Sequence, residues 1–318
     1  NDKNPLRDRT IQEHYSPGST FKLITAIAAM EEGIVDENTL IPCKGVFRSG
    51  RRNFHCWRWS GHGKVNVVQA LRESCDVYFY KIATKLDIDI LARYARLFGL
   101  GRKTGVGLPR ETTGLIPTKE WKKKRNGKDW HQGETLSCAI GQSYILTTPI
   151  QLALTYAVIA NGGKLFKPRI IKEIFSNSGE IKQKDEPEVV SQIDLGTKTL
   201  AYVKRGLYEA VNTRKGTAWH SRGENINMAG KTGTSQVIRM SAEKLFSKCE
   251  ENEYKHRHHA LFVGYAPEDK PEVAVSVVVE HGCQGSKVAA PIARDIITTY
   301  MNKYHHKLKK VVNVKEGV

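Results

Sequence analysis

The stretch Tyr15-Ser-Pro-Gly-Ser-Thr-Phe-Lys22 opens a long apolar helical pattern and carries its own chemistry. Pro17-Gly18 interrupts the chain directly before Ser19, and apolar residues then recur at helical spacing from Phe21 to Met30. Ser19 is therefore expected at a helix N-terminus, where backbone N–H groups favour developing negative charge. Lys22 lies one turn further on the same face, about 5–6 Å away between Cβ atoms. A lysine desolvated there is able to accept the serine proton.

Two further motifs follow along the chain. Ser74-Cys75-Asp76 interrupts a helical pattern, and Lys231-Thr232-Gly233-Thr234 follows apolar residues and leads into a predicted strand. Glycine allows a substrate backbone to approach the strand edge, while the lysine and the threonines offer hydrogen-bond donors to a carboxylate. Each motif is weak alone, because Ser241-Ala-Glu-Lys244 and Lys103-Thr-Gly105 repeat two of them. Those copies lie in a polar segment and in a glycine-rich turn, so we expect no chemistry from them.

The order of the predicted elements indicates an α+β fold. Helical spacing at 21–30, 65–71, 77–98, 148–161 and 193–212 precedes strands at 228–237, 260–265 and 273–280, and an amphipathic helix at 291–300 closes the pattern. Residues 36–64 show no periodicity. We expect a mainly helical part over 1–212 and an antiparallel sheet with its terminal helix over 213–318. Because the motifs occur in both parts, the two are expected to form one domain around one site.

Composition excludes several classes of protein. The chain has 318 residues, 40% of them hydrophobic, which excludes intrinsic disorder. The longest apolar stretch, Val273 to Val279, is too short to span a membrane. Asn1 begins no charged-then-apolar leader, so we expect a cytosolic protein or a soluble piece of a longer one.

The net charge is strongly positive. Fifty Lys and Arg against 33 Asp and Glu give +17, which is typical of proteins that meet nucleic acid, an anionic membrane surface or an anionic polymer. The densest basic runs lie at 119–128, 48–52 and 303–310. No nucleic-acid-binding motif accompanies them, so solvated loop charge is the simpler interpretation of each run.

Taken in this order and context, the three motifs resemble those of the penicillin-recognising acyl-serine transferases. The sequence is most similar to the class B penicillin-binding proteins of the penicillin-binding protein 2 type. Besides the motifs above, the resemblance rests on Gly61-His-Gly63, Glu73-Ser-Cys-Asp-Val-Tyr-Phe-Tyr80, Phe98-Gly-Leu-Gly101, Ile140-Gly-Gln142, Thr148-Pro-Ile-Gln151 and Gly230-Lys-Thr-Gly-Thr234. It implies the transpeptidase fold, an antiparallel sheet flanked by helices with a helical subdomain.

The resemblance also implies a role for each motif residue. Ser19 would attack the carbonyl between two D-alanines of a peptidoglycan stem peptide, with Lys22 as general base. Ser74, positioned by Asp76, would relay a proton to the leaving D-alanine. The substrate carboxylate would be held by Lys231, Thr232 and Thr234, with Gly233 between them, and the backbone N–H groups of Ser19 and Thr234 would form the oxyanion hole. Lys231 would also help to keep Lys22 neutral, and β-lactams would acylate Ser19 by the same attack.

Two positions depart from the family pattern. Asp76 stands where much of the superfamily has asparagine, although penicillin-binding protein 2 sequences often carry aspartate. Ser143 stands where the family commonly has glycine, which puts the geometry of that loop in doubt.

The resemblance further implies partners and a location. The expected partners are stem peptides ending in D-Ala-D-Ala, β-lactams, and the membrane glycosyltransferase and scaffold proteins of the cell-elongation complex, with no nucleic acid. The full-length protein would lie at the periplasmic face of the inner membrane and maintain cell shape. Only 18 residues precede Ser19, so we expect a trimmed chain that lacks N-terminal sheet strands and its anchor. The alternatives are a D,D-carboxypeptidase or serine β-lactamase on this fold, and a zinc-stapled polyanion-binding protein.

The six cysteines raise a separate question. Cys43, Cys56, His62 and Cys75 are spaced as Cys-x12-Cys-x5-His-x12-Cys over a possible zinc loop at 36–75, most of which lacks periodicity, and would supply a Cys3His set for structural zinc. His55 is the alternative histidine ligand. A disulfide such as Cys43–Cys56 and free thiols stay open as alternatives.

The remaining cysteines and histidines are assigned no chemistry. We expect Cys138 in the core and Cys249 as a loop thiol, and Cys283 has no assigned function. Five histidines in polar or terminal settings are expected at the solvated surface: His256, His258, His259, His305 and His306.

Overall fold

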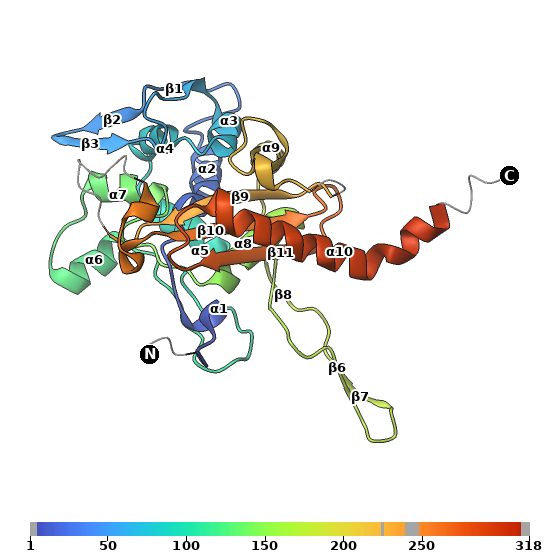
Figure 1. The fold of residues 1–318 in the computed structure, drawn as a ribbon. Helices are drawn as coiled ribbons and strands as arrows, with labels where there is room; N and C mark the ends of the chain where they lie inside the picture. The colour runs from blue at the N-terminus through green and yellow to red at the C-terminus, as the bar shows by residue number, and fades with distance from the viewer. Residues whose placement is uncertain (1–4, 224–225, 239–247, 313–318) are drawn as a thin grey trace.

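The computed structural model describes residues 5–223, 226–238 and 248–312, without the side chains of 305–312. Its main sheet has three antiparallel strands in the order β11 (Val273–Val279), β10 (His259–Ala266) and β9 (Ala229–Ser235). Helices lie on both faces, with α10 (Ala290–Val312) on one and α2 (Lys22–Glu31) and α8 (Pro149–Ala160) on the other (Figure 1). The α+β expectation is confirmed.

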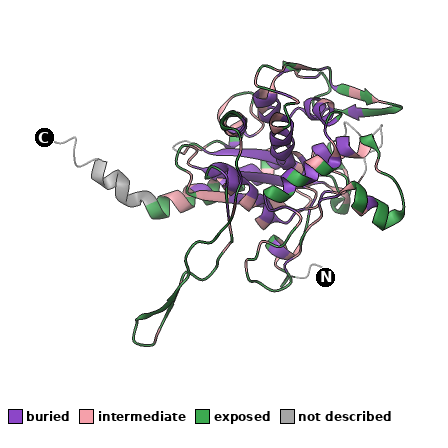
Figure 2. Ribbon diagram, turned by 180° about the vertical axis from the view of Figure 1, so that it is seen from behind, coloured by how far each residue is buried: buried purple, intermediate pink, exposed green. Residues whose placement is uncertain are grey.

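Strand alternation divides β10 between two cores, one on each face of the sheet. Leu261, Val263 and Tyr265 belong to the large core under the helical part, whereas Phe262 packs with Ile297 of α10 on the opposite face. Buried residues accordingly follow the sheet and the central helices through the molecule (Figure 2). The sheet is thus a rigid wall that carries the lysine–threonine–glycine motif on β9.

Most of the other helices precede this sheet in the chain. They are α1 (Arg9–Gln12), α3 (Val67–Arg72), α4 (Asp76–Ala83), α5 (Ile88–Leu97), α6 (Lys119–Asn126), α7 (Gln132–Ala139) and α9 (Thr197–Asn212), with the 3-10 turns η1 (Gly18–Phe21) and η2 (Trp219–Ser221). The 3-10 turns η3 (Cys249–Glu251) and η4 (Tyr254–His256) lie between β9 and β10, and the π turn η5 (Gly285–Ala289) follows β11. The helix expected over 77–98 is wrong as a single element, because it ends at Ala83 and a new one begins after Asp87. The Asp87 side chain accepts a hydrogen bond from Asp89 N–H and so starts α5.

Short two-stranded antiparallel sheets fill segments that showed little strand pattern. They are β1 (Ile41–Cys43) with β4 (Gly63–Val65), β2 (Val46–Ser49) with β3 (Arg52–His55), β5 (Lys164–Phe166) with β8 (Val189–Gln192), and β6 (Glu173–Phe175) with β7 (Ile181–Lys184). The β2–β3 and β6–β7 hairpins project from the body of the molecule at well-separated places (Figure 1). None of the described helices is long and apolar enough to cross a membrane.

Candidate active site

Ser19 lies in η1, the 3-10 turn that leads directly into α2. Gly18 has a φ of +53°, and a Cβ there would lie 2.3 Å from the carbonyl oxygen of Thr234. On the other side of the turn, a Cβ at Gly141 would lie 2.2 Å from the Gly18 carbonyl oxygen. Glycine at both positions therefore allows the turn to sit against β9. The helix-start placement of Ser19 is confirmed.

Lys22 is buried completely and points at the second motif. Its Nζ donates to Asp76 Oδ1 at 2.6 Å, to the Ser74 carbonyl oxygen at 2.9 Å and to Ser74 Oγ at 3.2 Å. Three acceptors match the three N–H bonds of an ammonium group. The Lys22 side chain thus joins the first motif to the second, although Lys22 and Ser74 are 52 residues apart in the chain.

The Ser74–Asp76 segment links α3 to α4 with an unusual backbone. Ser74 has a φ of +55°, a left-handed conformation that costs a non-glycine residue about 1–3 kcal/mol and is concentrated at functional sites. Cys75 then caps α4, its Sγ accepting from Tyr78 N–H at 3.4 Å. Asp76 Oδ2 accepts from the backbone N–H of Trp57 at 2.9 Å, so both of its oxygens have partners. The break predicted at 73–76 is confirmed.

The third motif occupies β9, opposite β10. Gly233 pairs with Leu261, and a Cβ at Gly233 would lie 2.8 Å from the Thr20 methyl group, which shows how closely η1 and β9 pack. Thr232 Oγ1 donates to Thr217 Oγ1 at 2.9 Å. Lys231 is completely buried, and its Nζ donates to the Thr232 carbonyl oxygen at 3.3 Å.

The three motifs meet at one open cleft of about 590 Å³. From the predicted set it is lined by Ser19, Ser74, Asp76, Thr232, Gly233 and Thr234, while Lys22 and Lys231 lie behind them. The sequence interpretation gave no site role to Gln142, Thr217 or His258, which also line it. Gln142 Nε2 donates to the Thr234 carbonyl oxygen at 2.9 Å. The sequence did carry a signal for Gln142, because it belongs to the Ile140-Gly-Gln142 element of the family resemblance. Thr217 and His258 had none.

Burial shifts the ionisation of the charged groups behind the cleft. It raises the pKa of Asp76, and the Lys22 ammonium opposes that shift. Burial also holds the pKa of Lys231 well below the usual lysine range, with the positive charge of Lys22 acting in the same direction. Of the two lysines, Lys22 has the carboxylate partner, whereas Lys231 has none among the described residues.

Cys43, Cys56, His62 and Cys75 come together beside the cleft, with their ligand atoms all within 4.8 Å of one another. His62 Nδ1 lies 3.6 Å from Cys43 Sγ and 3.5 Å from Cys56 Sγ. A tetrahedral zinc ion with Zn–S bonds of about 2.3 Å and a Zn–N bond of about 2.0 Å places sulfur and nitrogen ligands about 3.5 Å apart. The donor set and its spacing therefore fit zinc. The three thiols are not disulfide-bonded, and His55 lies outside the group.

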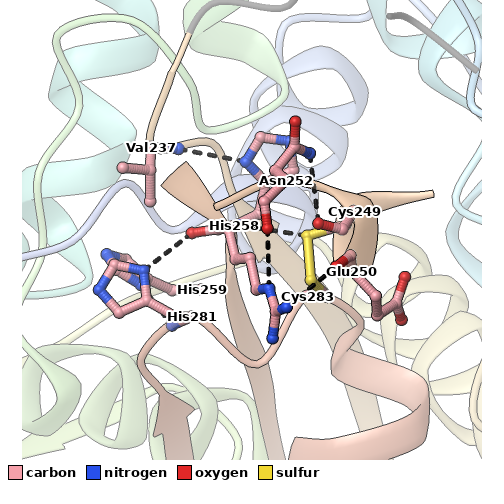
Figure 3. Close-up of a disulfide and its surroundings, with 9 residues drawn as sticks. Val237, Cys249, Glu250, Asn252, His258, His259, His281 and Cys283 are labelled. Atoms are coloured by element: carbon pink, nitrogen blue, oxygen red, sulfur yellow. Dashed lines mark hydrogen bonds between the residues drawn. A yellow bond between two sulfur atoms is a disulfide. The ribbon is translucent and has the colours of Figure 1, made fainter. Parts of the chain in front are cut away.

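The disulfide lies elsewhere, and it corrects the view of Cys249 as a loop thiol. Cys249 is bonded to Cys283, 34 residues away, with the Cα atoms 5.6 Å apart (Figure 3). The bond joins η3 to the turn before η5, two segments that both contribute lining to the cleft. No spacing pattern could have paired them, because each cysteine is alone in its loop. Cys138 is buried, as expected.

His258 is also a correction, because it is 8% exposed rather than solvated. The ring Nδ1 of His258 accepts from Val237 N–H at 3.3 Å, and the backbone N–H of His258 donates to Cys249 Sγ at 3.3 Å (Figure 3). His259 is half-buried, and burial lowers its pKa to about 4. The return of the chain into β10 makes these contacts, which local polarity could not reveal. His305 and His306 lie outside the described side chains.

Of the two motif copies and the two departures from the family pattern, one copy and both departures lie in the described residues. Lys103-Thr-Gly105 lies in a segment without helix or strand, whereas Ser241-Ala-Glu-Lys244 lies outside the described residues. Ser143 has a φ of +66°, the conformation that favours glycine, and so keeps the backbone shape of the family pattern. Asp76 forms the ion pair with Lys22 described above.

Comparisons with known proteins agree with this geometry. Residues 1–298 match the penicillin binding protein transpeptidase domain. The chain is 36% identical over 304 residues to the peptidoglycan D,D-transpeptidase MrdA of Haemophilus influenzae and 34% identical over 307 residues to that of Escherichia coli K12. These alignments cover 94% and 95% of this chain but 46% and 48% of those proteins, so the chain spans about half the length of the curated relatives it matches.

Superpositions on solved structures agree with the sequence matches. Penicillin-binding protein 2 of Helicobacter pylori, in complex with MreC, superposes with a TM-score of 0.81 at 35% identity over 96% of this chain and 53% of that one. Penicillin-binding protein 2 of Pseudomonas aeruginosa, in complex with WCK 5153, gives 0.82 at 34% identity over 95% and 64%. The chain resembles penicillin-binding proteins of the penicillin-binding protein 2 type, and it belongs to the penicillin-binding protein transpeptidase domain family.

Proposed function

We propose that this chain is the D,D-transpeptidase domain of a penicillin-binding protein 2, which cross-links peptidoglycan stem peptides. The observation that carries the proposal is the junction of three motifs at one cleft. Ser19 opens a helix at the cleft floor, Lys22 joins it to Ser74 and Asp76, and β9 supplies the opposite wall. This is the arrangement that acyl transfer to a serine requires.

The first half of the reaction makes an acyl-serine. Ser19 Oγ attacks the carbonyl carbon between the two D-alanines, and its proton passes to Lys22 once Lys22 is neutral. The oxyanion receives hydrogen bonds from the backbone N–H groups of Ser19 and Thr234. Collapse breaks the peptide C–N bond, and the terminal D-alanine leaves as an amine after Ser74 relays a proton to it. Ser74 Oγ lies 3.2 Å from Lys22 Nζ, which supports that path.

The second half consumes the acyl-serine. An amine of a neighbouring stem peptide attacks the ester carbonyl, a new peptide bond forms, and Ser19 Oγ leaves with the proton that the amine gives up. Thr232 and Thr234 face the cleft, and their hydroxyls would donate to the substrate carboxylate, with the Thr232 hydroxyl turning from its present acceptor, Thr217 Oγ1. Lys231 lies behind them, where its charge when protonated adds to the attraction.

Covalent labelling tests the proposal. A fluorescent penicillin is expected to label this chain and to leave a Ser19→Ala variant unlabelled. A long-lived acyl-enzyme, together with cross-linked product from stem pentapeptides and an amine acceptor, is the expected result. Turnover of the penicillin within seconds would identify a β-lactamase instead, and D-alanine release without cross-linking a D,D-carboxypeptidase. Absence of labelling, with salt-sensitive binding to polyanions, would favour the zinc-stapled binding protein.

We extend the proposal to the setting of the protein. MrdA proteins are peptidoglycan D,D-transpeptidases by name, and the Helicobacter pylori structure contains MreC. A further structural relative, 34% identical, is part of a peptidoglycan synthase complex that coordinates polymerization and crosslinking. By analogy this chain would act in cell elongation at the periplasmic side of the inner membrane, beside a glycosyltransferase and scaffold proteins.

We also propose that Cys43, Cys56, His62 and Cys75 hold a structural zinc ion. Such an ion would supply cross-linking and no redox chemistry. Its support is the fit of the ligand spacing described above. Elemental analysis of the purified chain is expected to find about one zinc per chain, and a metal-free, folded chain would contradict the assignment.

A further inference from the structure

The segment from Ile41 to Lys64, which we call the cationic lobe, carries charge of only one sign. It contains six basic residues and no Asp or Glu: Lys44, Arg48, Arg51, Arg52, Arg58 and Lys64. All six are exposed. Within the described part of the chain, only Arg58 forms an ion pair, at 3.7 Å from Glu73, so the lobe presents largely uncompensated charge. This is unlike α6, where Lys123 and Lys124 have carboxylate partners.

The inner edge of the cationic lobe is a wall of the cleft. His55, Cys56 and Trp57 line the cleft together with Ser19 and Ser74. In the β2–β3 hairpin, Val46 pairs with His55 and Arg48 pairs with Asn53. Because side chains alternate along strands, Arg48 lies on the same hairpin face as His55, two residues further from the cleft. A chain that leaves the cleft past His55 therefore passes over Arg48.

Two exposed indole rings accompany these cations. Trp57 is 59% exposed and Trp59 is 75% exposed, which is unusual for tryptophan. Trp57 is held in place, because its backbone N–H donates to Asp76 and its indole Nε1 donates to the Glu73 carbonyl oxygen at 3.0 Å. Its polar group is therefore satisfied by the protein. Its ring also meets the His62 ring, with centroids 5.5 Å apart, yet more than half of the residue stays exposed for contact with another molecule.

The cationic lobe is also fixed to the molecule rather than loosely attached. An isolated two-stranded hairpin is marginally stable by itself. Here Phe54 is 5% exposed and packs against Tyr80 of α4, with ring centroids 5.2 Å apart. Cys43 and Cys56, at the two ends of the hairpin, both contact His62. The cations and rings are thus presented in a set position beside the cleft.

We propose that the cationic lobe binds the anionic glycan–peptide strand whose terminal peptide occupies the cleft. This inference rests on the proposed transpeptidase function. Stem peptides carry free carboxylates, which arginine binds through charge-assisted hydrogen bonds. The glycan consists of sugar rings, whose apolar faces pack on exposed indole rings. The lobe therefore extends the cleft from a peptide site to a strand site, and it would distinguish polymeric substrate from a free pentapeptide.

The test measures binding of soluble, uncross-linked glycan strands with pentapeptide stems, in a Ser19→Ala background that prevents turnover. Arg48→Gln with Arg51→Gln is expected to raise the Kd about fivefold or more in ~50 mM salt, and the difference should shrink in ~500 mM salt. Trp59→Ala is expected to raise it about threefold. The matched control is Lys172→Gln with Lys182→Gln, which removes the same charge from the exposed β6–β7 hairpin region and should leave the Kd unchanged.

Two additional probes separate the sources of anionic charge. Strands with amidated carboxylates are expected to bind equally to the chain with and without Arg48→Gln and Arg51→Gln. The lobe variant and the control variant should bind equally to vesicles of phosphatidylglycerol and phosphatidylcholine. Equal strand binding by lobe and control variants would overturn the inference, as would a lobe effect confined to vesicles. Penicillin labelling of the unaltered chain reports the proposed function separately, so a labelled chain with lobe-independent strand binding fails only this inference.

Discussion

Two cysteine sites border the cleft, and they cross-link the molecule in different ways. The Cys43–Cys56–His62–Cys75 cluster gathers four ligand atoms from a segment of 33 residues, and Cys75 stands between two residues of the second motif. The Cys249–Cys283 disulfide joins two loops on the opposite wall. His258 links Cys249 to Val237, just beyond β9, and Gly285, two residues after Cys283, packs against Gly233 of β9. The cluster therefore includes a residue of the second motif itself, whereas the disulfide fixes two loops that pack beside the third motif.

Removing one ligand of the cluster is expected to have the largest effect. Cys43→Ser leaves the cleft-lining residues in place but breaks the proposed zinc site, and zinc sites of this kind contribute about 10–16 kcal/mol of apparent binding free energy. The lobe should open, Trp57 should release Asp76, and penicillin acylation of Ser19 should slow by about tenfold or more. Zinc content, limited proteolysis and the acylation rate measure this.

Cys138→Ser is the matched control for the loss of a cysteine. Cys138 is a buried free thiol outside the cluster, so its variant should keep zinc and acylate at close to the normal rate. If Cys43→Ser kept its zinc and its acylation rate, the coupling of the cluster to Asp76 would be wrong.

Breaking the disulfide is expected to have the next largest effect, and mainly on stability. For a sequence separation of 34 residues, chain entropy gives a cross-link about 4 kcal/mol of stabilisation. Cys249→Ser with Cys283→Ser should lower the free energy of unfolding by roughly 2–4 kcal/mol. Urea unfolding measures it.

A reductant provides the internal control for this pair. It should destabilise the unaltered chain by a similar amount and have no further effect on the double variant. A double variant as stable as the unaltered chain, or one that acylates more slowly than Cys43→Ser, would reverse the ranking of the two sites.

The same contrast explains what the sequence could predict. The cluster was predictable because its ligands recur within one segment that has no apolar core of its own, and because Cys75 falls between two motif residues. The disulfide was not, since the turn that carries Cys283 and the loop that carries Cys249 meet only when β10 and β11 have paired. The motifs predicted Ser19, Ser74 and β9 at one cleft, whereas Thr217 reaches it through a hydrogen bond to Thr232 that no local pattern encodes.

The secondary structure also contains elements that the sequence predicted and elements that it did not. Periodicity predicted α2, α8 and the three sheet strands because burial of one face decides them. It failed at 77–98, where the apolar pattern continues across a break made by the Asp87 cap, and at β2–β3, whose strands are too short and too exposed for alternation to be seen.

The smallest effect should come from the hydrogen bond that connects the disulfide wall to Val237, two residues beyond the end of β9. Burial lowers the pKa of His258, so the folded state favours the neutral ring, whose Nδ1 accepts from Val237 N–H. The unfolded chain binds this proton below a pH of about 6.5, so the contribution of His258 to stability is present above that pH and is lost as the pH falls through it. The pKa of His259 is lowered to about 4, so His259 also loses its contribution to stability as the pH falls.

His258→Asn should separate the two histidines. Asparagine keeps an acceptor for Val237 N–H and cannot be protonated in this range, so the free energy of unfolding should fall less between about pH 7 and 5 than in the unaltered chain. His258→Leu removes the acceptor and should cost about 1–3 kcal/mol at every pH. Urea unfolding across the pH range distinguishes them. Parallel pH profiles for the unaltered chain and His258→Asn would show that His258 contributes no proton-linked stability, and the link between the disulfide and β9 would then be one of shape alone.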